Sequence, residues 1–387
     1  MPLAEMGVSV LDCEHKTPPA ASSGFPYIAI PEIQDGRVMV SQSRLISEEH
    51  LIEWTRRTTP RAGDIVVTRR GRVGDTAPIP SGLRCAIGQN LVLLRSNGLR
   101  VDQAYLRWAV RSPQWWAEVD RLMNVGAVFS SLNVKDIARI RLDFPQLRDQ
   151  QAIAAVLGAL DDKIASNLAL IAKAREYALL ISRVHAPMTR LGNVVIHQSR
   201  QVQPANMSEE EVDLFSLPRF DSGVGAERVH PSEIKSGKFL IEGSVVLVSK
   251  LNPRIPRIWP IDEDGSVVPK FASTEFLVLE PFTCTPDVLW ALLSQPEFTS
   301  ALEGQVAGTS GSHQRVRPAD LLSTRIPDPR LISPQLHEDI NGVLAPVRAL
   351  LRENRTLAAT RDALLPQLMS SKLRVRDAER IPAEAGA

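Results

Sequence analysis

The chain contains the same helical pattern twice, about half a chain apart. Apolar residues recur at alternating spacings of four and three over residues 153–181 and again over 340–368. Ile340 lies 187 positions after Ile153, and the two stripes keep this offset throughout (340 − 153 = 187). A seven-residue rhythm sustained over roughly four heptads is typical of a helix that faces another helix along its length. We therefore expect two long helices, each following its own globular segment.

The simplest partner for each predicted helix is the other one. If the two run antiparallel, the asparagines in the fifth place of each stripe, Asn167 and Asn354, lie close together near the middle. A polar residue in an apolar seam costs stability but fixes the register. Packing of each helix on its own globular segment is the alternative, and the persistence of the stripes favours a coiled coil. At ~1.5 Å per residue, about 33 residues would separate the globular segments by roughly 50 Å.

The globular segments are duplicated as well. GDIVVTRRGRVG from Gly63 corresponds to GSVVLVSKLNPRIP from Gly243, and Asp136 aligns with Asp320. Short apolar bursts between glycines and prolines predict strands joined by tight turns, with a helix in each segment. The expected fold class is α+β, a tandem duplication of an α/β domain plus a long helix, with the two helices pairing as an antiparallel coiled coil. The predicted boundaries are 1–146, 147–186, 187–330 and 331–387.

Composition restricts the possible roles only weakly. The 387 residues are 44% hydrophobic and 23% charged, which is enough for two or three packed domains. A net charge of +1 neither favours nor excludes a polyanionic partner. The three cysteines are far apart, so we expect no disulfide or metal framework. Without a signal peptide or a long apolar run, we expect a cytoplasmic protein that has no contact with a membrane.

Several stretches resemble the specificity subunits of type I restriction-modification systems. FPQLRDQQAIAAVLGALDDKIASN is similar to the central conserved region of that family, and TRDALLPQLMSSKLRV is similar to its distal one. DCEHKTPPAASSGFPYIAIPEI, GDIVVTRRGRVG, VFSSLNVKDIARIRL and SKLNPRIPR are similar to its target-recognition domains. The resemblance runs in order along nearly the whole chain and includes the duplication.

The resemblance implies a DNA-recognition subunit in which each globular domain reads one half of a bipartite, asymmetric site. It also implies that the coil sets the unread spacer between the halves. The implied partners are double-stranded DNA, two methylase subunits and ATP-dependent restriction subunits. The chain would hold no cofactor of its own, since S-adenosylmethionine, ATP and Mg²⁺ are expected in the partner subunits.

Recognition of phosphates and base edges requires guanidinium, ammonium and amide groups. A first group of candidates follows one predicted strand at matching places in the two halves: Arg69, Arg70 and Arg72, then Lys250, Asn252, Arg254 and Arg257. A second group precedes the last strand of each half: Ser131, Asn133 and Lys135, then His313, Gln314, Arg315 and Arg317. A solvated turn would explain the first group in one half, but the matched placement favours a shared role. Capping of the next helix by serine explains the second group equally well.

The sequence offers no catalytic site of its own. It lacks a GxxxxGK[ST] phosphate loop and an Asn-Pro-Pro-aromatic tetrapeptide, and its seven histidines form no metal-ligand spacing. Two alternatives remain open: a specificity subunit for a fused methylase-nuclease partner, and a coiled-coil scaffold that touches no DNA. Charged positions beside the stripes are candidate contacts for the methylase subunits, among them Asp161, Asp162, Lys163, Arg352 and Glu353. For each of them alone, the expected role is a solvated helix face.

Overall fold

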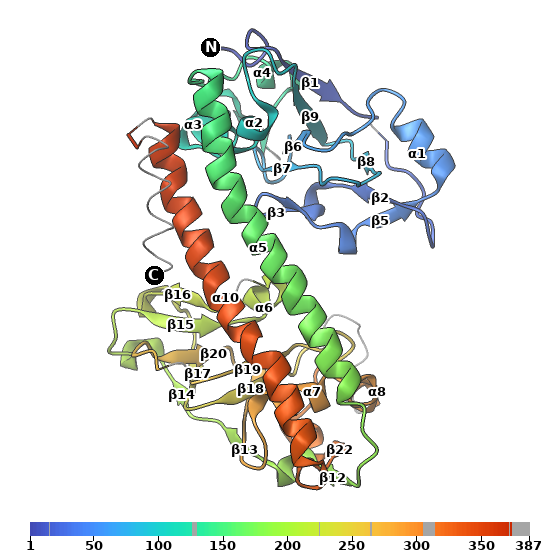
Figure 1. Cartoon of the computed structure of the whole chain (residues 1–387), viewed down its shortest axis with the longest axis vertical. Helices are drawn as coiled ribbons and strands as arrows, with labels where there is room; N and C mark the ends of the chain where they lie inside the picture. Colours follow the sequence, from blue (N-terminus) through green and yellow to red (C-terminus); the bar gives the residue numbers. More distant parts are fainter. Residues whose placement is uncertain are drawn as a thin grey trace. The chain divides into compact units, whose positions relative to one another are not determined.

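A computed structural model describes residues 1–14, 16–125, 130–223, 225–263, 265–304, 314–370 and 372–373. The chain divides into two compact units. Unit 1 comprises Met1–Lys163 together with the chain from Leu357 onward, and unit 2 comprises Ile164–Thr356. Both divisions fall inside long helices, α5 (Leu147–Ile181) and α10 (Pro334–Met369), so each unit contains part of each helix (Figure 1). The domain boundaries drawn from the sequence stay a prediction.

A four-stranded antiparallel sheet recurs in the two units. Its strand order is β1-β9-β6-β7 in unit 1 and β13-β21-β18-β19 in unit 2. Val66 pairs with Leu93 in unit 1, and Leu247 pairs with Val278 at the equivalent place in unit 2. The strands are β1 (Val8–Asp12), β6 (Ile65–Thr68), β7 (Thr76–Pro78) and β9 (Leu91–Ser96), then β13 (Val195–Gln198), β18 (Val245–Ser249), β19 (Ile258–Ile261) and β21 (Phe276–Pro281).

This register corrects the alignment of the two halves by one residue. Gly63 and Gly243 are 180 positions apart, but Val66 and Leu247 are 181 apart (247 − 66 = 181). Both strands begin two residues after their glycine, but β18 is one residue longer than β6. Arg69 therefore matches Lys250.

The second sheets of the units differ. Unit 1 has a three-stranded sheet in the order β5-β2-β8 and the hairpin β3-β4, and unit 2 has a five-stranded sheet in the order β14-β17-β20-β15-β16. The unit 1 elements are β2 (Phe25–Ile28), β3 (Ile33–Gln34), β4 (Arg37–Val38), β5 (Arg44–Ile46), β8 (Ala86–Ile87) and α1 (Glu48–Trp54). The unit 2 elements are β14 (Gln201–Val202), β15 (Val212–Phe215), β16 (Glu227–Val229), β17 (Lys238–Ile241), β20 (Lys270–Ala272) and α6 (Leu217–Ser222).

Three short helices follow the repeated sheet in each unit. Asp102 caps the first helix of unit 1 by accepting from the N–H of Tyr105 at 2.9 Å, and Thr285 caps its counterpart by accepting from the N–H of Val288 at 3.3 Å. The helices are α2 (Gln103–Ala109), α3 (Pro113–Leu122) and α4 (Val134–Ile137), then α7 (Pro286–Leu293), α8 (Pro296–Glu303) and α9 (Pro318–Ser323). Short strand pairs complete the units: β10 (Asn124–Val125) with β11 (Ser130–Ser131), and β12 (Met188–Arg190) with β22 (Arg325–Pro327).

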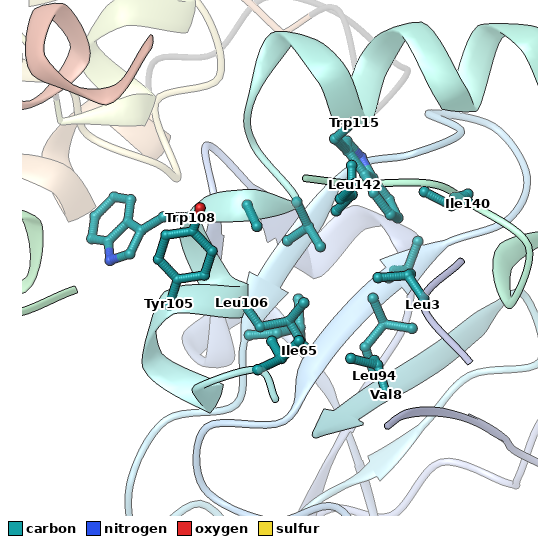
Figure 2. Packing of buried hydrophobic residues seen from close by; sticks show 14 of the residues in the cluster. Leu3, Val8, Ile65, Leu94, Tyr105, Leu106, Trp108, Trp115, Ile140 and Leu142 are labelled. Atoms are coloured by element: carbon teal, nitrogen blue, oxygen red, sulfur yellow. The ribbon is translucent and has the colours of Figure 1, made fainter. Parts of the chain in front are cut away.

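The main core of unit 1 lies between its repeated sheet and the helices. Figure 2 shows Ile65 and Leu94 of the sheet close to Leu106 of α2, with Trp115 of α3 in the same cluster. The long helices belong to this core as well. Ile153, Leu157 and Leu160 of α5 and Leu364, Leu365 and Leu368 of α10 are all buried in it.

Unit 2 is built in the same way from the other parts of the long helices. Ile171 and Ala178 of α5 lie in one buried cluster with Ile340, Leu344 and Val347 of α10. The sequence suggested either pairing of the two helices or packing of each helix on its globular segment. The apolar stripes do both, because they face the other helix and the globular domain together. Each long helix contributes to both units and not only to the segment that precedes it. No described helix has the length and apolar character that crossing a membrane requires.

Within unit 2, α5 and α10 run antiparallel and side by side (Figure 1). The Nδ2 of Asn167 donates to the Oδ1 of Asn354 at 2.9 Å and to the Oε2 of Glu353 at 2.8 Å. Asn167 is buried. The two asparagines therefore lie together, as expected from their matched places. Their role in fixing the register stays a prediction.

A buried ion pair joins the helices to the globular part of unit 1. Asp161 of α5 is 5% exposed and accepts from Arg361 of α10 at 2.6 Å and from Arg107 of α2. The expectation that Asp161 is a surface contact for a partner is therefore wrong. Burial, with the neighbouring Arg111 adding to it, lowers the pKa of Arg107 to about 10.

Unit 2 has a matching connection with the charges reversed. Arg348 of α10 lies 187 positions after Asp161, at the equivalent place beside the second stripe (348 − 161 = 187). It donates to Asp287 of α7 and forms an ion pair with Asp262 at 3.0 Å. Burial raises the pKa of Asp287 above its ordinary value although Arg348 opposes the shift. One position on the duplicated helix therefore carries an anion in unit 1 and a cation in unit 2.

Replacing Asp161 with asparagine tests the buried pair. Asp161→Asn keeps the side-chain size but leaves Arg107 and Arg361 without their shared carboxylate. We expect the free energy of unfolding, measured by urea denaturation, to fall by about 3 kcal/mol. The control Glu48→Gln breaks an exposed ion pair with Arg84, whose side chains are 63% and 64% exposed, and should cost less than ~1 kcal/mol. Equal stability of the two variants would contradict the assignment.

Candidate nucleic-acid interface

The structure brings the two groups of candidate residues together in unit 1. Arg69 directly follows β6, and its carbonyl accepts from the N–H of Leu132 at 2.9 Å. Arg70 forms an antiparallel bridge with Ser131. Leu132 is buried in the main core and anchors this pairing. Two segments about 60 residues apart in the chain therefore form one surface (132 − 69 = 63).

Unit 2 repeats this pairing at equivalent positions. The carbonyl of Lys250 accepts from the N–H of Val316 at 3.0 Å, and Leu251 forms an antiparallel bridge with Arg315. Val316 is buried in the core, as Leu132 is in unit 1. The shared role inferred from matched sequence positions thus has a shared backbone geometry behind it.

A third segment joins this surface in both units, and sequence reasoning missed it. The N–H of Arg69 donates to the carbonyl of Asn90 at 2.8 Å, and the N–H of Lys250 donates to the carbonyl of Glu275 at 2.8 Å. Asn90 immediately precedes β9, and Glu275 immediately precedes β21. These two strands pair with β6 and β18, the strands that lead into the basic turns. A prediction that β6 pairs with β9, and β18 with β21, would have placed the third segment beside the basic turn.

The three arginines of the unit 1 turn have different surroundings. Arg70 is exposed, whereas Arg69 is half-buried and its Nη2 donates to the carbonyl of Gln89 at 3.4 Å. Arg72 donates to the carbonyl of Ile30 at 2.8 Å and pairs with Asp75 at 2.9 Å. Arg72 therefore braces the neighbouring loop although its side chain is 49% exposed, and Arg70 is exposed beside it.

The turn in unit 2 shows the same division of tasks. Arg257 is 14% exposed and its Nε and Nη2 donate to Asp221 at 2.6 and 2.9 Å, so its charge is already paired. Arg254 is exposed. Asn252 has a φ of 49° and donates its N–H to the carbonyl of Gln314 at 2.9 Å, which holds the turn against the second segment. Burial lowers the pKa of half-buried Lys250 below its ordinary value.

The second group is polar and accessible in both units. Asn133 is exposed and donates to Asp136 at 2.9 Å, and Lys135 is exposed beside it. Ser131 lies in β11 and does not cap α4, so the serine-capping explanation does not apply to it. Arg317 is exposed just before α9.

The remaining residues of that group lie next to the third segment. Arg315 is 61% exposed and its Nη2 donates to the Oε1 of Glu275 at 2.7 Å. Gln314 has a buried Oε1 that bonds no group in the described part of the chain. His313 lies outside the described residues.

Each unit thus presents cationic, amide and hydroxyl groups on three backbone segments tied to its core. Within the described residues, no three histidine, cysteine, aspartate or glutamate side chains gather so that they could hold a metal ion. Cations suit phosphate oxygens, and amides, carboxylates and guanidinium groups suit base edges.

Comparisons with known proteins agree with this chemistry. Residues 15–175 match the family described as type I restriction modification DNA specificity domain. The putative type I restriction enzyme MjaX specificity subunit of Methanocaldococcus jannaschii is 33% identical over 101 residues. That match covers 26% of this chain and 23% of the relative, or about a quarter of each.

A solved structure shares the fold along nearly the whole chain. The crystal structure of a type I restriction-modification system S subunit from M. genitalium superimposes with a TM-score of 0.53 at 15% identity, covering 93% of both chains. At that identity the likeness establishes the α+β architecture alone. Over residues 15–175, the chain is similar to the type I restriction modification DNA specificity domain family.

Proposed function

We propose that this chain is the DNA sequence-recognition subunit of a type I restriction-modification complex. Each unit would read one half of a bipartite, asymmetric site and so direct adenine methylation or cleavage by partner subunits. The observation that supports this most is the equivalent pairing of Arg69 with Leu132 and of Lys250 with Val316. It supports the proposal because it brings the chain segments that carry most of the candidate residues side by side in each unit.

The side chains on the two surfaces fit duplex DNA of different sequences. Exposed cations such as Arg70 and Arg254 can neutralise phosphates, which supplies affinity without sequence preference. Side chains on the adjoining segments differ between the units, so the two surfaces would read different base pairs. Equivalent backbone pairing with unlike side chains suits an asymmetric, two-part site.

The proposal includes the partners that the family resemblance implies. Two methylase subunits and ATP-dependent restriction subunits would carry the chemistry, with S-adenosylmethionine, ATP and Mg²⁺ bound there, in the cytoplasm. The part of α5 in unit 2 offers a surface for one of them. Leu170, Tyr177 and Leu180 are 55%, 54% and 59% exposed, and their spacings of seven and three place them on one helix face. Three large apolar side chains on an exposed face favour burial against another protein.

Mapping of methylated adenine in the host genome tests the recognition function. Deleting the gene should remove methylation at one split, asymmetric motif, because the methylase subunits would lose their targeting subunit. Restoring the gene should return it at the same motif. An unchanged methylome in a strain that expresses the partner subunits would contradict the proposal.

Single substitutions of the exposed turn arginines test the binding surfaces. Arg70→Gln and Arg254→Gln should each weaken binding to duplex DNA, measured by fluorescence anisotropy across a salt series. Each should make the slope of log K against log salt shallower by about one unit, as expected for one lost phosphate contact.

The matched control for this pair is Arg100→Gln. Arg100 is exposed beyond the end of β9 opposite to Asn90, away from the three segments. Its replacement should leave the slope unchanged. If Arg70→Gln and Arg254→Gln behave like Arg100→Gln, the two turns do not contact the DNA backbone.

A further inference from the structure

The third segment of each unit lines a hollow beside the basic turn. In unit 1 the hollow has a volume of about 540 Å³ and is lined by Gln89 and Asn90 together with Ser43 and Arg44. In unit 2 it has a volume of about 480 Å³ and is lined by Thr274, Glu275, Lys250, Arg315 and Arg317. Both hollows present hydrogen-bonding side chains next to the turns that would contact the phosphates.

The matched positions on these segments carry different chemistry. Asn90 and Glu275 make the same backbone bond to the turn, and they lie 185 positions apart (275 − 90 = 185). Unit 1 therefore offers the amides of Gln89, which is exposed, and Asn90, which is half-buried. Unit 2 offers a carboxylate at the equivalent place, held against the guanidinium of Arg315 at 2.7 Å.

These groups match different base pairs in the major groove. An amide can donate to N7 and accept from the N6 amino group of adenine, which identifies an A·T pair. A guanidinium donates to O6 and N7 of guanine, and a carboxylate accepts from the N4 amino group of cytosine. The Glu275 and Arg315 side chains are 30% and 61% exposed. They hold an acceptor and a donor side by side, as the two edges of a G·C pair require.

We infer that the third segments are specificity determinants: Gln89 and Asn90 read an A·T pair in one half-site, and Glu275 with Arg315 reads a G·C pair in the other. This inference rests on the proposed function, because it assigns base contacts within the surfaces described above. It adds Gln89, Asn90 and Glu275, which lie outside both groups of candidates, and gives Arg315 of the second group a specific role. The backbone bonds fix where the segments lie, and the side chains at these positions set what they read.

The test begins with the motif that the wild-type chain specifies together with its methylase partner. Binding of the full-length chain is then measured to duplexes that carry this motif and to each single-base-pair replacement. Glu275→Gln preserves the side-chain shape but turns the acceptor partly into a donor. We expect the preference for G·C at one position of one half-site to fall at least about fivefold. Every preference in the other half-site should be unchanged.

The reciprocal exchange tests the other unit. Asn90→Glu should move the preference at one position of the other half-site from A·T toward C·G, and the isosteric Asn90→Asp should weaken the A·T preference. Circular dichroism melting checks that each variant is folded, and Arg100→Gln serves as the control that keeps the wild-type motif. Asn90→Asp keeps the test decisive if Asn90→Glu does not fold.

Two results would overturn the inference alone, and a third would reject the proposed function together with it. A uniform loss of affinity with the motif unchanged would show that the segments only support the turns. A change of preference in the wrong half-site, or at a different kind of base pair, would reject the assignment. A wild-type chain that specifies no motif with its partner would reject the proposed function itself, and the inference with it.

Discussion

Each globular domain completes its core with parts of both long helices. Leu157 of α5 and Leu365 of α10 lie in one buried cluster in unit 1, and Ile171 of α5 and Leu344 of α10 lie in one in unit 2. Neither helix can shift along the other without moving apolar side chains out of a core. The pairing of the two helices and the folding of the two domains are therefore one constraint, because the same stripe residues satisfy both.

On the recognition surfaces, backbone and side chains have separate tasks. Backbone bonds from Arg69 to Leu132 and Asn90, and from Lys250 to Val316 and Glu275, hold three segments together in each unit. These bonds depend little on which side chains the segments carry. The side chains at those positions can therefore differ between the units without disturbing the sheet. A duplicated domain can acquire a second target in this way while its architecture stays the same.

Much of the architecture was predictable because periodicity is a local property of the chain. The stripes of α5 and α10, the duplication and the placement of Asn167 beside Asn354 all follow from spacing alone. Ion pairs between residues far apart in the sequence cannot be predicted in this way, because they depend on the three-dimensional fold. Arg72 and Arg257 read as free cations in the sequence, but Asp75 and Asp221 already pair with them.

The third segment was missed for a similar reason. Gln89 and Asn90 carry no charge signal, and only the pairing of β6 with β9 places them beside the basic turn. Asp161 was placed on a solvent face because a charge next to an apolar stripe usually lies there. Arg107, which comes from a distant helix, accounts for its burial.

The reversed charges on the two long helices bear on how such a protein can evolve. In the first globular domain, Asp161 of α5 pairs with Arg107 of α2. In the second, Arg348 of α10 pairs with Asp287 of α7. A recombination event that moved the first domain into the second place would set Arg107 against Arg348. Exchange with a domain that also carries a cation at the place of Arg107 would keep opposite charges together. The charge on each long helix is thus compatible with a domain in its own position and opposes the move of a domain from one position to the other.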